Sequence, residues 1–270
     1  YAAKMEHTTG AFILGMENTP RYHLESNLIR SAVSAADLPR IRAIVAQAAT
    51  ELLESSRADG EFDAVQSYAR RIALRLVQDF FGVPGPDYAT MARWMRSIFW
   101  EIFLNFSNDS RVTEEATRSS LEMKPYLEAL IAQRKSDLEQ GRPVPDDFVS
   151  RLVQRQRAEG TTFDDDTLRR SLGGVIVGAV DTVSKAIIHA LDQLLRRPEQ
   201  LAGAIEAARA NDDALVSAYA FEALRFNPHN PIIVRTCHRD TVVAQGTPRE
   251  RTIAQGTTIY AANFSAMFDG

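Results

Sequence analysis

Residues 164–195 read DDDTLRRSLGGVIVGAVDTVSKAIIHALDQLL, and this stretch decides the fold class of the chain. Its three leading carboxylates can accept hydrogen bonds from the free amides of a helix N-terminus and oppose the helix dipole. The apolar pattern that follows them continues to Leu195. The stretch therefore predicts a single helix, the longest in the chain.

Further helices are predicted on both sides of this one, because apolar side chains recur there at helical spacing. Pro125 lies inside one of them and predicts a kink or a break. Another carries both tryptophans and has aromatic residues all round, so we expect it to face apolar material on several sides. The predicted helices cover residues 37–54, 64–81, 88–106, 114–137, 146–157, 198–208 and 212–226.

Small strands are predicted near the end of the chain, where short β-branched or apolar runs alternate with turn residues. These runs lie at 232–234, 241–244 and 258–261. The sequence has no internal repeat, no low-complexity tract and no linker composition. We therefore expect one domain over residues 1–270, mainly α with a small β element near its C-terminal end.

The composition excludes several classes of protein. Of the 270 residues, 45% are hydrophobic and 24% are charged, a balance that permits a sizeable core and excludes disorder as the main state. The formal net charge of -4 argues against a nucleic-acid partner. The longest run without a polar side chain, 173–180, is far shorter than the roughly 20 apolar residues of a membrane span. One cysteine allows no internal disulfide, so we expect a cytoplasmic protein.

Small residues, an acid and a hydroxyl interrupt the apolar run of the long helix at Gly178-Ala179-Val180-Asp181-Thr182. A glycine costs about 1 kcal/mol relative to alanine in a helix, and an unpaired buried carboxylate costs more. One interpretation is close helix packing, with Asp181 in solvent and Thr182 bonded back to a carbonyl. The other is a functional site at Asp181 and Thr182.

Three further charged residues, Glu222, Arg225 and Arg235, lie beside apolar or aromatic residues in the sequence. Glu222 and Arg225 lie at i and i+3 on one helix face, among aromatic residues that suggest partial burial. There a guanidinium fork can hold the carboxylate and nearby carbonyls together; the alternative is an exposed surface pair. Arg235 follows the apolar run 232–234, and an anion is its natural partner.

No metal site is predicted from the adjacent Cys237 and His238. Neighbours on a strand point to opposite faces, and one thiol with one imidazole does not complete a zinc site.

Taken in order along the chain, these features resemble the cytochrome P450 family, and the resemblance covers essentially the whole sequence. Each motif is weak alone, but together they stand in the family order at family-like separations. They are Phe81-Gly82-Val83-Pro84, Asp146-Asp147-Phe148-Val149, Gly178 to Thr182, Leu194 to Leu201 with Pro198, Glu222-x-x-Arg225, Arg235, and Ile253-x-x-Gly256-Thr257.

The resemblance implies a haem-thiolate monooxygenase of the soluble bacterial type, with haem b (heme b, iron protoporphyrin) as cofactor. It would take electrons from a donor such as a ferredoxin or a reductase, and insert one oxygen atom of dioxygen into a hydrophobic small-molecule substrate. The helix at 88–106 would lie in the roof of the substrate pocket.

The same resemblance implies roles for individual residues. Asp181 and Thr182 would be the acid and alcohol pair that delivers protons, and Gly178 with Ala179 would form the groove over the haem. Arg235 would pair with a haem propionate. The structural pair behind the haem would be Glu222 with Arg225.

Some positions depart from the family pattern. The glycine-rich loop that carries the ligand cysteine is absent, so we expect a partial chain that also lacks an N-terminal part and is inactive by itself. Cys237 is no substitute for the ligand. Ala179 replaces a glycine, and Val183 replaces a hydroxyl. His23 resembles a residue that reaches the other propionate, although Asn27 stands where an arginine is expected and the next basic residue is Arg30.

Two alternatives stay open at this point. The first is a haem enzyme that rearranges a fatty-acid hydroperoxide without an electron donor, against which the Asp181–Thr182 pair argues. The second is a non-catalytic helical module that binds an apolar ligand.

Overall fold

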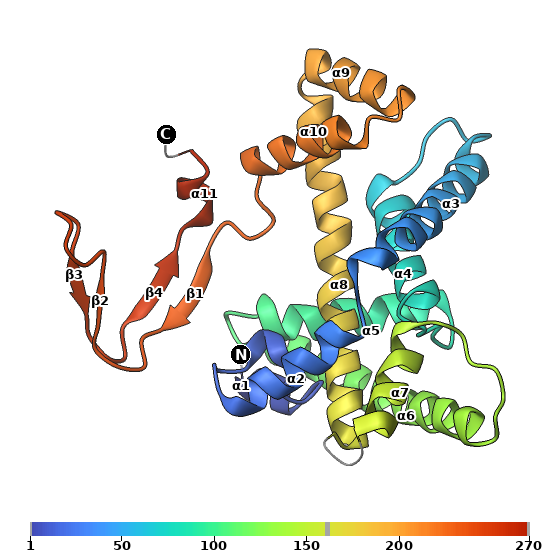
Figure 1. Cartoon of the computed structure of the whole chain (residues 1–270). Coiled ribbons are helices and arrows are strands. Elements are labelled where there is room, and N and C mark those ends of the chain that lie inside the picture. The colour runs from blue at the N-terminus through green and yellow to red at the C-terminus, as the bar shows by residue number, and fades with distance from the viewer. Residues whose placement is uncertain (1, 160–162, 269–270) are drawn as a thin grey trace. The chain divides into compact units, whose positions relative to one another are not determined.

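The computed structural model describes residues 2–159 and 163–268. It divides into two units, Tyr1–Ser184 and Lys185–Gly270, and each is described by itself. The long helix α8, Asp165–Leu195, runs from the first unit into the second (Figure 1).

Among the described residues of the first unit, all regular elements are helical. Its single-turn elements are η1 Ile13–Gly15, η2 Ala35–Asp37 and the π-helical turn η3 Ala64–Ala69. Its α-helices before α8 are α1 Ala2–Glu6, α2 Pro20–Ser31, α3 Leu38–Ser56, α4 Arg70–Asp79, α5 Tyr88–Phe103, α6 Ser110–Glu139 and α7 Phe148–Glu159.

The core of this unit forms where α8 meets the helices around it. The buried side chains come from α2, α4, α5, α6, α7 and the first half of α8, so one apolar cluster joins most of the unit. Among its largest fully buried members are Phe12, Leu28, Leu74, Met91, Met95, Ile98, Leu127, Phe148, Leu152 and Leu168.

The N-terminal segment is fastened along α8 by both backbone and side-chain contacts. Arg169 donates to the carbonyl of Thr9 at 3.1 Å, and Arg170 donates to the carbonyl of Ala11. The ring of Phe12 is fully buried against Gly174, where a Cβ atom would lie 2.1 Å from the ring. A glycine at 174 is therefore required by this packing.

The second unit adds short helices and two small sheets to the end of α8. The helices are α9 Pro198–Arg209, α10 Asp213–Phe226 and α11 Asn263–Ala266. Strands β1 Ile233–Thr236 and β4 Thr258–Ala261 pair antiparallel, with Arg235 opposite Ile259. Strands β2 Thr241–Val243 and β3 Arg251–Ile253 form the other antiparallel pair.

One arginine connects α10 to the end of the second unit. Arg225 donates to the carbonyl of Met267 at 2.9 Å, and its guanidinium lies 5.2 Å from the ring centroid of Phe268. Arg197, which ends the turn before α9, stacks on Phe226 at 4.2 Å. These two arginines thus lie on aromatic faces, a favourable arrangement for a guanidinium.

Most predicted elements are present with small shifts of their ends, and the mainly α fold with a small β element is confirmed. The predicted helix at 64–81 begins instead with the π turn, capped by Asp63, and the α-helix ends at Asp79. The predicted break at Pro125 does not occur. Helix α6 continues through Pro125, and the side chains of Met123 and Leu127 on either side of it are buried in the core. The expectation of one domain stays a prediction.

Elements that the apolar spacing did not predict are mostly short or polar. Helix α2 begins with Pro20 and is capped by the Thr19 hydroxyl, which accepts from the amide of Tyr22 at 3.2 Å. Strand β3 is largely exposed, so it carries no apolar pattern. Helices α1 and α11 have only five and four residues.

Helix α8 is, among the described residues, the one helix long and apolar enough to cross a membrane. The sequence prediction considered only the uninterrupted run 173–180, whereas a longer window of α8 has a mean hydropathy of 1.5. This is weak evidence, because 44% of that window is buried inside the structure, as in core helices of soluble proteins.

We predict that Gly174→Ala lowers the free energy of unfolding by about 1–3 kcal/mol, because the buried ring of Phe12 must move. Denaturant unfolding of the 270-residue chain, followed by circular dichroism, measures this. Gly178→Ala is the matched control, since its Cβ would meet only the Cδ1 atom of Leu14 at 3.0 Å, and Leu14 is 59% exposed. Equal free energies of unfolding for the two variants would contradict the packing described.

We also predict that Arg225→Ala increases amide hydrogen exchange at Met267 and Phe268. These amides bond to Asn263 and Ser265 within the last turn, which Arg225 holds in place. Arg197→Ala serves as the control because Arg197 stacks on Phe226 and bonds to Gln193. Exchange that rises equally in both variants would show that Arg225 does not hold this turn.

Candidate functional site

Asp181 lies in the wall of α8 and is paired with an arginine of another helix. Its Oδ1 atom accepts from Nη2 of Arg70 at 2.9 Å, and the two side chains are only 14% and 12% exposed. The second oxygen, Oδ2, is buried and bonds to no atom of the described residues, and the same is true of Arg70 Nε. The solvated Asp181 of the packing interpretation is therefore wrong.

Two opposing effects act on the pKa of Asp181. Burial raises the pKa of this carboxyl above its ordinary value, while the positive charges of Arg70 and Arg96 oppose that rise. Arg96 lies on α5, where its exposed side chain is stacked 5.9 Å from the ring centroid of Trp100. Two cations from two helices thus act on one buried acid.

Thr182 makes local hydrogen bonds. Its hydroxyl donates to the carbonyl of Gly178 at 2.6 Å and reaches that of Ala179 at 3.2 Å. This is the back-bonding that the packing interpretation predicted. Because adjacent residues on a helix do not face each other, Asp181 and Thr182 share a turn of α8 but have separate partners.

The small residues of this turn lie beside the N-terminal segment. Gly178 is buried, and a Cβ there would meet only the Cδ1 atom of Leu14 at 3.0 Å, a contact that the exposed Leu14 side chain can relieve. Ala179 is partly exposed.

Glu222 and Arg225 are joined by two hydrogen bonds, of 2.7 and 2.9 Å, in a bidentate arrangement. Glu222 is 56% and Arg225 36% exposed, so the pair is less buried than its aromatic neighbours suggested. The expected grip on a nearby carbonyl is present, in the contact of Arg225 with Met267. The arginine lowers the pKa of the Glu222 carboxyl by hydrogen bonding.

Arg235 projects from β1 into solvent. It donates to the carbonyl of Val234 at 2.9 Å, and among the described residues no carboxylate lies within ion-pair distance of it. Most donors of this guanidinium are therefore available to an anion. His23 is exposed on α2, where its ring packs edge-on against Tyr22 with centroids 5.4 Å apart.

Cys237 is buried, and its thiol bonds to the neighbouring backbone. It is 7% exposed, and its thiol donates to the carbonyl of Arg239 at 2.9 Å. A thiol in this setting is a structural one. Among the described residues, no group of three or more possible metal ligands is gathered in one place.

Sequence reasoning missed Arg70, Arg96 and His229. Arg70 and Arg96 belong to no motif, and only the structure brings them to Asp181. His229 has two buried ring nitrogens that bond to no described atom; burial lowers its pKa, and the neighbouring charges of Lys185 and His189 add to the effect.

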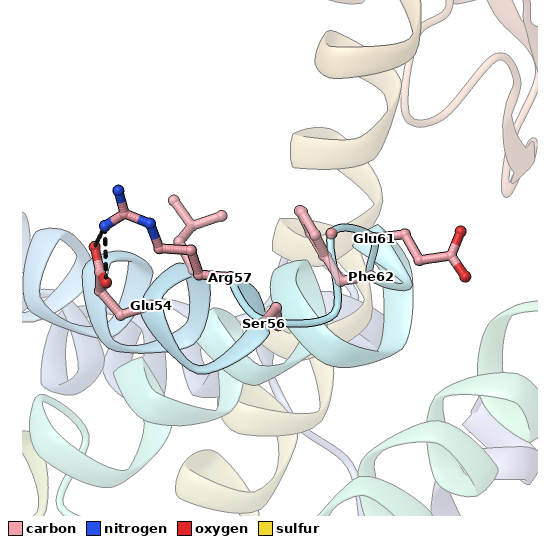
Figure 2. A pocket seen from close by; sticks show the side chains of 7 residues that line it. Glu54, Ser56, Arg57, Glu61 and Phe62 are labelled. Atoms are coloured by element: carbon pink, nitrogen blue, oxygen red, sulfur yellow. Dashed lines mark hydrogen bonds and ion pairs between the residues drawn. The ribbon is translucent and has the colours of Figure 1, made fainter.

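A shallow hollow of about 300 Å³ lies at the end of α3, and none of these residues lines it (Figure 2). Leu53, Phe62 and the ion pair of Glu54 with Arg57, 3.4 Å apart, line part of it. No residue that the sequence singled out contributes to this hollow, so it plays no part in the candidate site.

Comparison with known proteins gives several similar relatives. Erythromycin C-12 hydroxylase of Saccharopolyspora erythraea is 26% identical over 241 residues, which are 88% of this chain and 57% of that protein. Mycinamicin IV hydroxylase/epoxidase of Micromonospora griseorubida is 25% identical over 198 residues, which are 69% and 46% of the two chains. The chain thus spans about half the length of these relatives.

Solved structures agree on the fold. The crystal structure of CalO2 matches with a TM-score of 0.81 at 21% identity, covering 98% of this chain and 62% of that one. The model of the family described as cytochrome P450 matches residues 86–269, which is more than half of the chain and includes Asp181, Glu222 and Arg235. On this match, the chain belongs to the cytochrome P450 family.

Proposed function

We propose that the chain is part of a haem-thiolate monooxygenase that inserts one oxygen atom of dioxygen into an apolar small molecule. The observation that carries the proposal is the family match over 86–269, a range that holds the acid and hydroxyl of α8. The relatives named as hydroxylases and an epoxidase support oxygen insertion. Because the chain spans about half of them, the activity belongs to the longer protein.

The described residues fit part of a haem site. Arg235 offers a guanidinium that has no carboxylate partner among the described residues, which suits the propionate of a haem. When bound, the haem would supply the activation of dioxygen. Gly178 and Ala179 would border it on α8. His23, exposed on α2, is the second candidate for a propionate.

Cys237 is not suited to be the sulfur ligand of the haem iron. The residue is 7% exposed and its sulfur is already bonded to the carbonyl of Arg239, so it is not presented to a ligand. We therefore assign the ligand to another cysteine of the longer protein, and expect this chain alone to be inactive. An electron donor such as a ferredoxin or a reductase and a cytoplasmic location complete the proposal.

Asp181 and Thr182 are the residues that we propose to handle protons. Asp181 can take up a proton at Oδ2, the oxygen that Arg70 leaves free, and burial raises the pKa of this carboxyl. The Thr182 hydroxyl can exchange its bond to Gly178 for one to an incoming oxygen atom. A hydroxyl and an acid on the same helical turn are suited to passing a proton inward from the protein.

An apolar substrate is supported by helix α5. Phe99 and Phe103 pack together with ring centroids 4.9 Å apart, while Trp100 on the same helix is 44% exposed. Such aromatic side chains bind apolar molecules through buried area.

We predict that Thr182→Ala in the complete protein reduces product formation by about 10²-fold while oxygen consumption persists, since a positioned proton donor is lost. Oxygen uptake and product are measured together with the reduced electron donor. Ser184→Ala is the matched control, because Ser184 makes the same back-bond, to Val180 at 2.7 Å, two residues further along α8. Unchanged coupling in Thr182→Ala, or turnover of a fatty-acid hydroperoxide without the electron donor, would contradict the proposal.

The ligand assignment has its own test. We predict that Cys237→Ser in the complete protein keeps the thiolate-type carbon monoxide difference spectrum, and that the 270-residue chain alone, mixed with haem, lacks it. Loss of that spectrum in Cys237→Ser, with folding intact by circular dichroism, would make Cys237 the ligand and overturn this assignment.

A further inference from the structure

The loop 227–231, which follows α10 and precedes β1, carries a histidine whose ring is left without hydrogen bonds. His229 is half-buried, and both of its ring nitrogens, Nδ1 and Nε2, are buried without a bond to any described atom. A neutral imidazole has one donor and one acceptor, whereas a protonated ring has two donors and a charge. A buried charge without a partner costs far more than a buried neutral group. The packed loop therefore accommodates the neutral ring much better than the protonated one.

Helix α8 holds this loop through backbone carbonyls. Nδ1 of His189 bonds to the carbonyl of Asn227 at 3.0 Å, and Nζ of Lys185 donates to the carbonyl of His229 at 3.0 Å. Because a carbonyl can only accept, Nδ1 of His189 carries a proton. Both of these side chains stay donors whether or not His189 gains a second proton.

The C-terminal segment holds the same loop through two more carbonyls. The amide of Phe264 donates to Pro231 at 3.0 Å, and the side-chain amide of Asn263 donates to Asn230 at 3.1 Å. Prolines have no amide hydrogen to donate, so the loop depends on such carbonyl contacts. A segment held by single hydrogen bonds can detach without unfolding the helices beside it.

The charges that act on the His229 ring are positive. Burial lowers its pKa, and the charges of Lys185 and His189 on α8 lower it further. Among the described residues no carboxylate lies within ion-pair distance of the ring. Asp192, also on α8, interacts with His189 and is bonded to Arg196. The ring thus has two cations beside it and no anion to compensate a third.

We propose that the loop 227–231 is a pH-sensitive switch, which lies on α8 while the His229 ring is neutral and detaches when that ring takes up a proton. The proton comes from solvent and forms an N–H bond at the ring nitrogen that lacks one. In the detached loop, water accepts from both N–H groups and separates the ring from Lys185 and His189. When the proton returns to solvent, the loop binds α8 again. The switch does not depend on the proposed oxygen insertion.

The direction of the pH effect follows from the lowered pKa of His229. The attached loop binds the proton less tightly than the detached loop does, where the ring has the ordinary histidine pKa of about 6.5. Attachment is therefore fully favoured above that pH and is lost as the pH falls below it. A proton that enters only the detached form raises the ratio of detached to attached loop about tenfold between pH 7.5 and pH 5.5.

The test measures hydrogen exchange of the Phe264 amide in the 270-residue chain, because its bond to Pro231 breaks when the loop leaves. After correction for the pH dependence of exchange itself, we expect its protection to fall about tenfold from pH 7.5 to pH 5.5. The Cys237 amide, bonded to Thr257 at 2.9 Å, should keep its protection. Constant protection of Phe264, or an equal fall at Cys237, would overturn the proposal.

Variants identify the responsible ring. His229→Phe and His229→Gln cannot take up the proton, so the fall in Phe264 protection should vanish in both. His189→Gln is the matched control, because its amide can still donate to Asn227, and it should keep the fall. A fall that persists in the His229 variants, or that disappears in His189→Gln, would overturn the assignment to His229.

A titration of the wild-type chain keeps the proposal testable if the His229 variants do not fold. The ring protons of the five histidines are followed by NMR, and the signal that shifts most in Lys185→Gln marks His229, since a neighbouring charge is lost. Its midpoint should lie at lower pH than that of an ordinary histidine and move to higher pH in Lys185→Gln. Five midpoints at the ordinary value, unchanged in Lys185→Gln, would contradict the switch.

Discussion

A carboxylate placed in the wall of a packed helix needs a cation beside it, and this constraint organises the first unit of the protein. Asp181 lies on α8, whose first half contributes to the main apolar cluster. Its partner comes from α4, and a second positive charge comes from α5. Breaking such a pair on one side leaves an uncompensated buried charge, which costs more than most single contacts in a protein provide.

Helix α8 also holds the N-terminal segment, which packs closely against its small residues. Gly174 lets the Phe12 ring reach the helix backbone, and Leu14 covers Gly178 one turn later. Arg169 and Arg170 then bind backbone carbonyls of that segment. Gly174 therefore has a structural reason in the chain itself, whereas the proposed groove over a haem concerns Gly178 and Ala179.

The sequence was sufficient for the elements that have apolar spacing and clear ends. Pro198 and the aspartates at 164–166 marked helix starts, and the order of motifs indicated the family that the comparisons support. Irregular features were out of reach. The π turn before Arg70 follows from backbone geometry, and β3 exists only through its pairing with β2.

The candidate site was predicted only in part, for a related reason. Thr182 bonds to a carbonyl of its own helix, so local sequence was enough to expect it. Asp181 bonds to Arg70, which is 111 positions away in the sequence, and no spacing rule predicts such a partner. Burial of Glu222 and Arg225 was overestimated because Phe221, on the same helix, is itself 73% exposed. Contacts within one turn were readable from the sequence, and contacts between distant helices were not.

The most direct test of the account is a crystal structure of the complete protein with its haem bound. The account predicts a haem propionate within hydrogen-bond distance of the Arg235 guanidinium. It also predicts that Thr182 borders the bound haem and that the ligand sulfur comes from a cysteine other than Cys237. A haem bound through Cys237, or one that lies away from both Thr182 and Arg235, would contradict it.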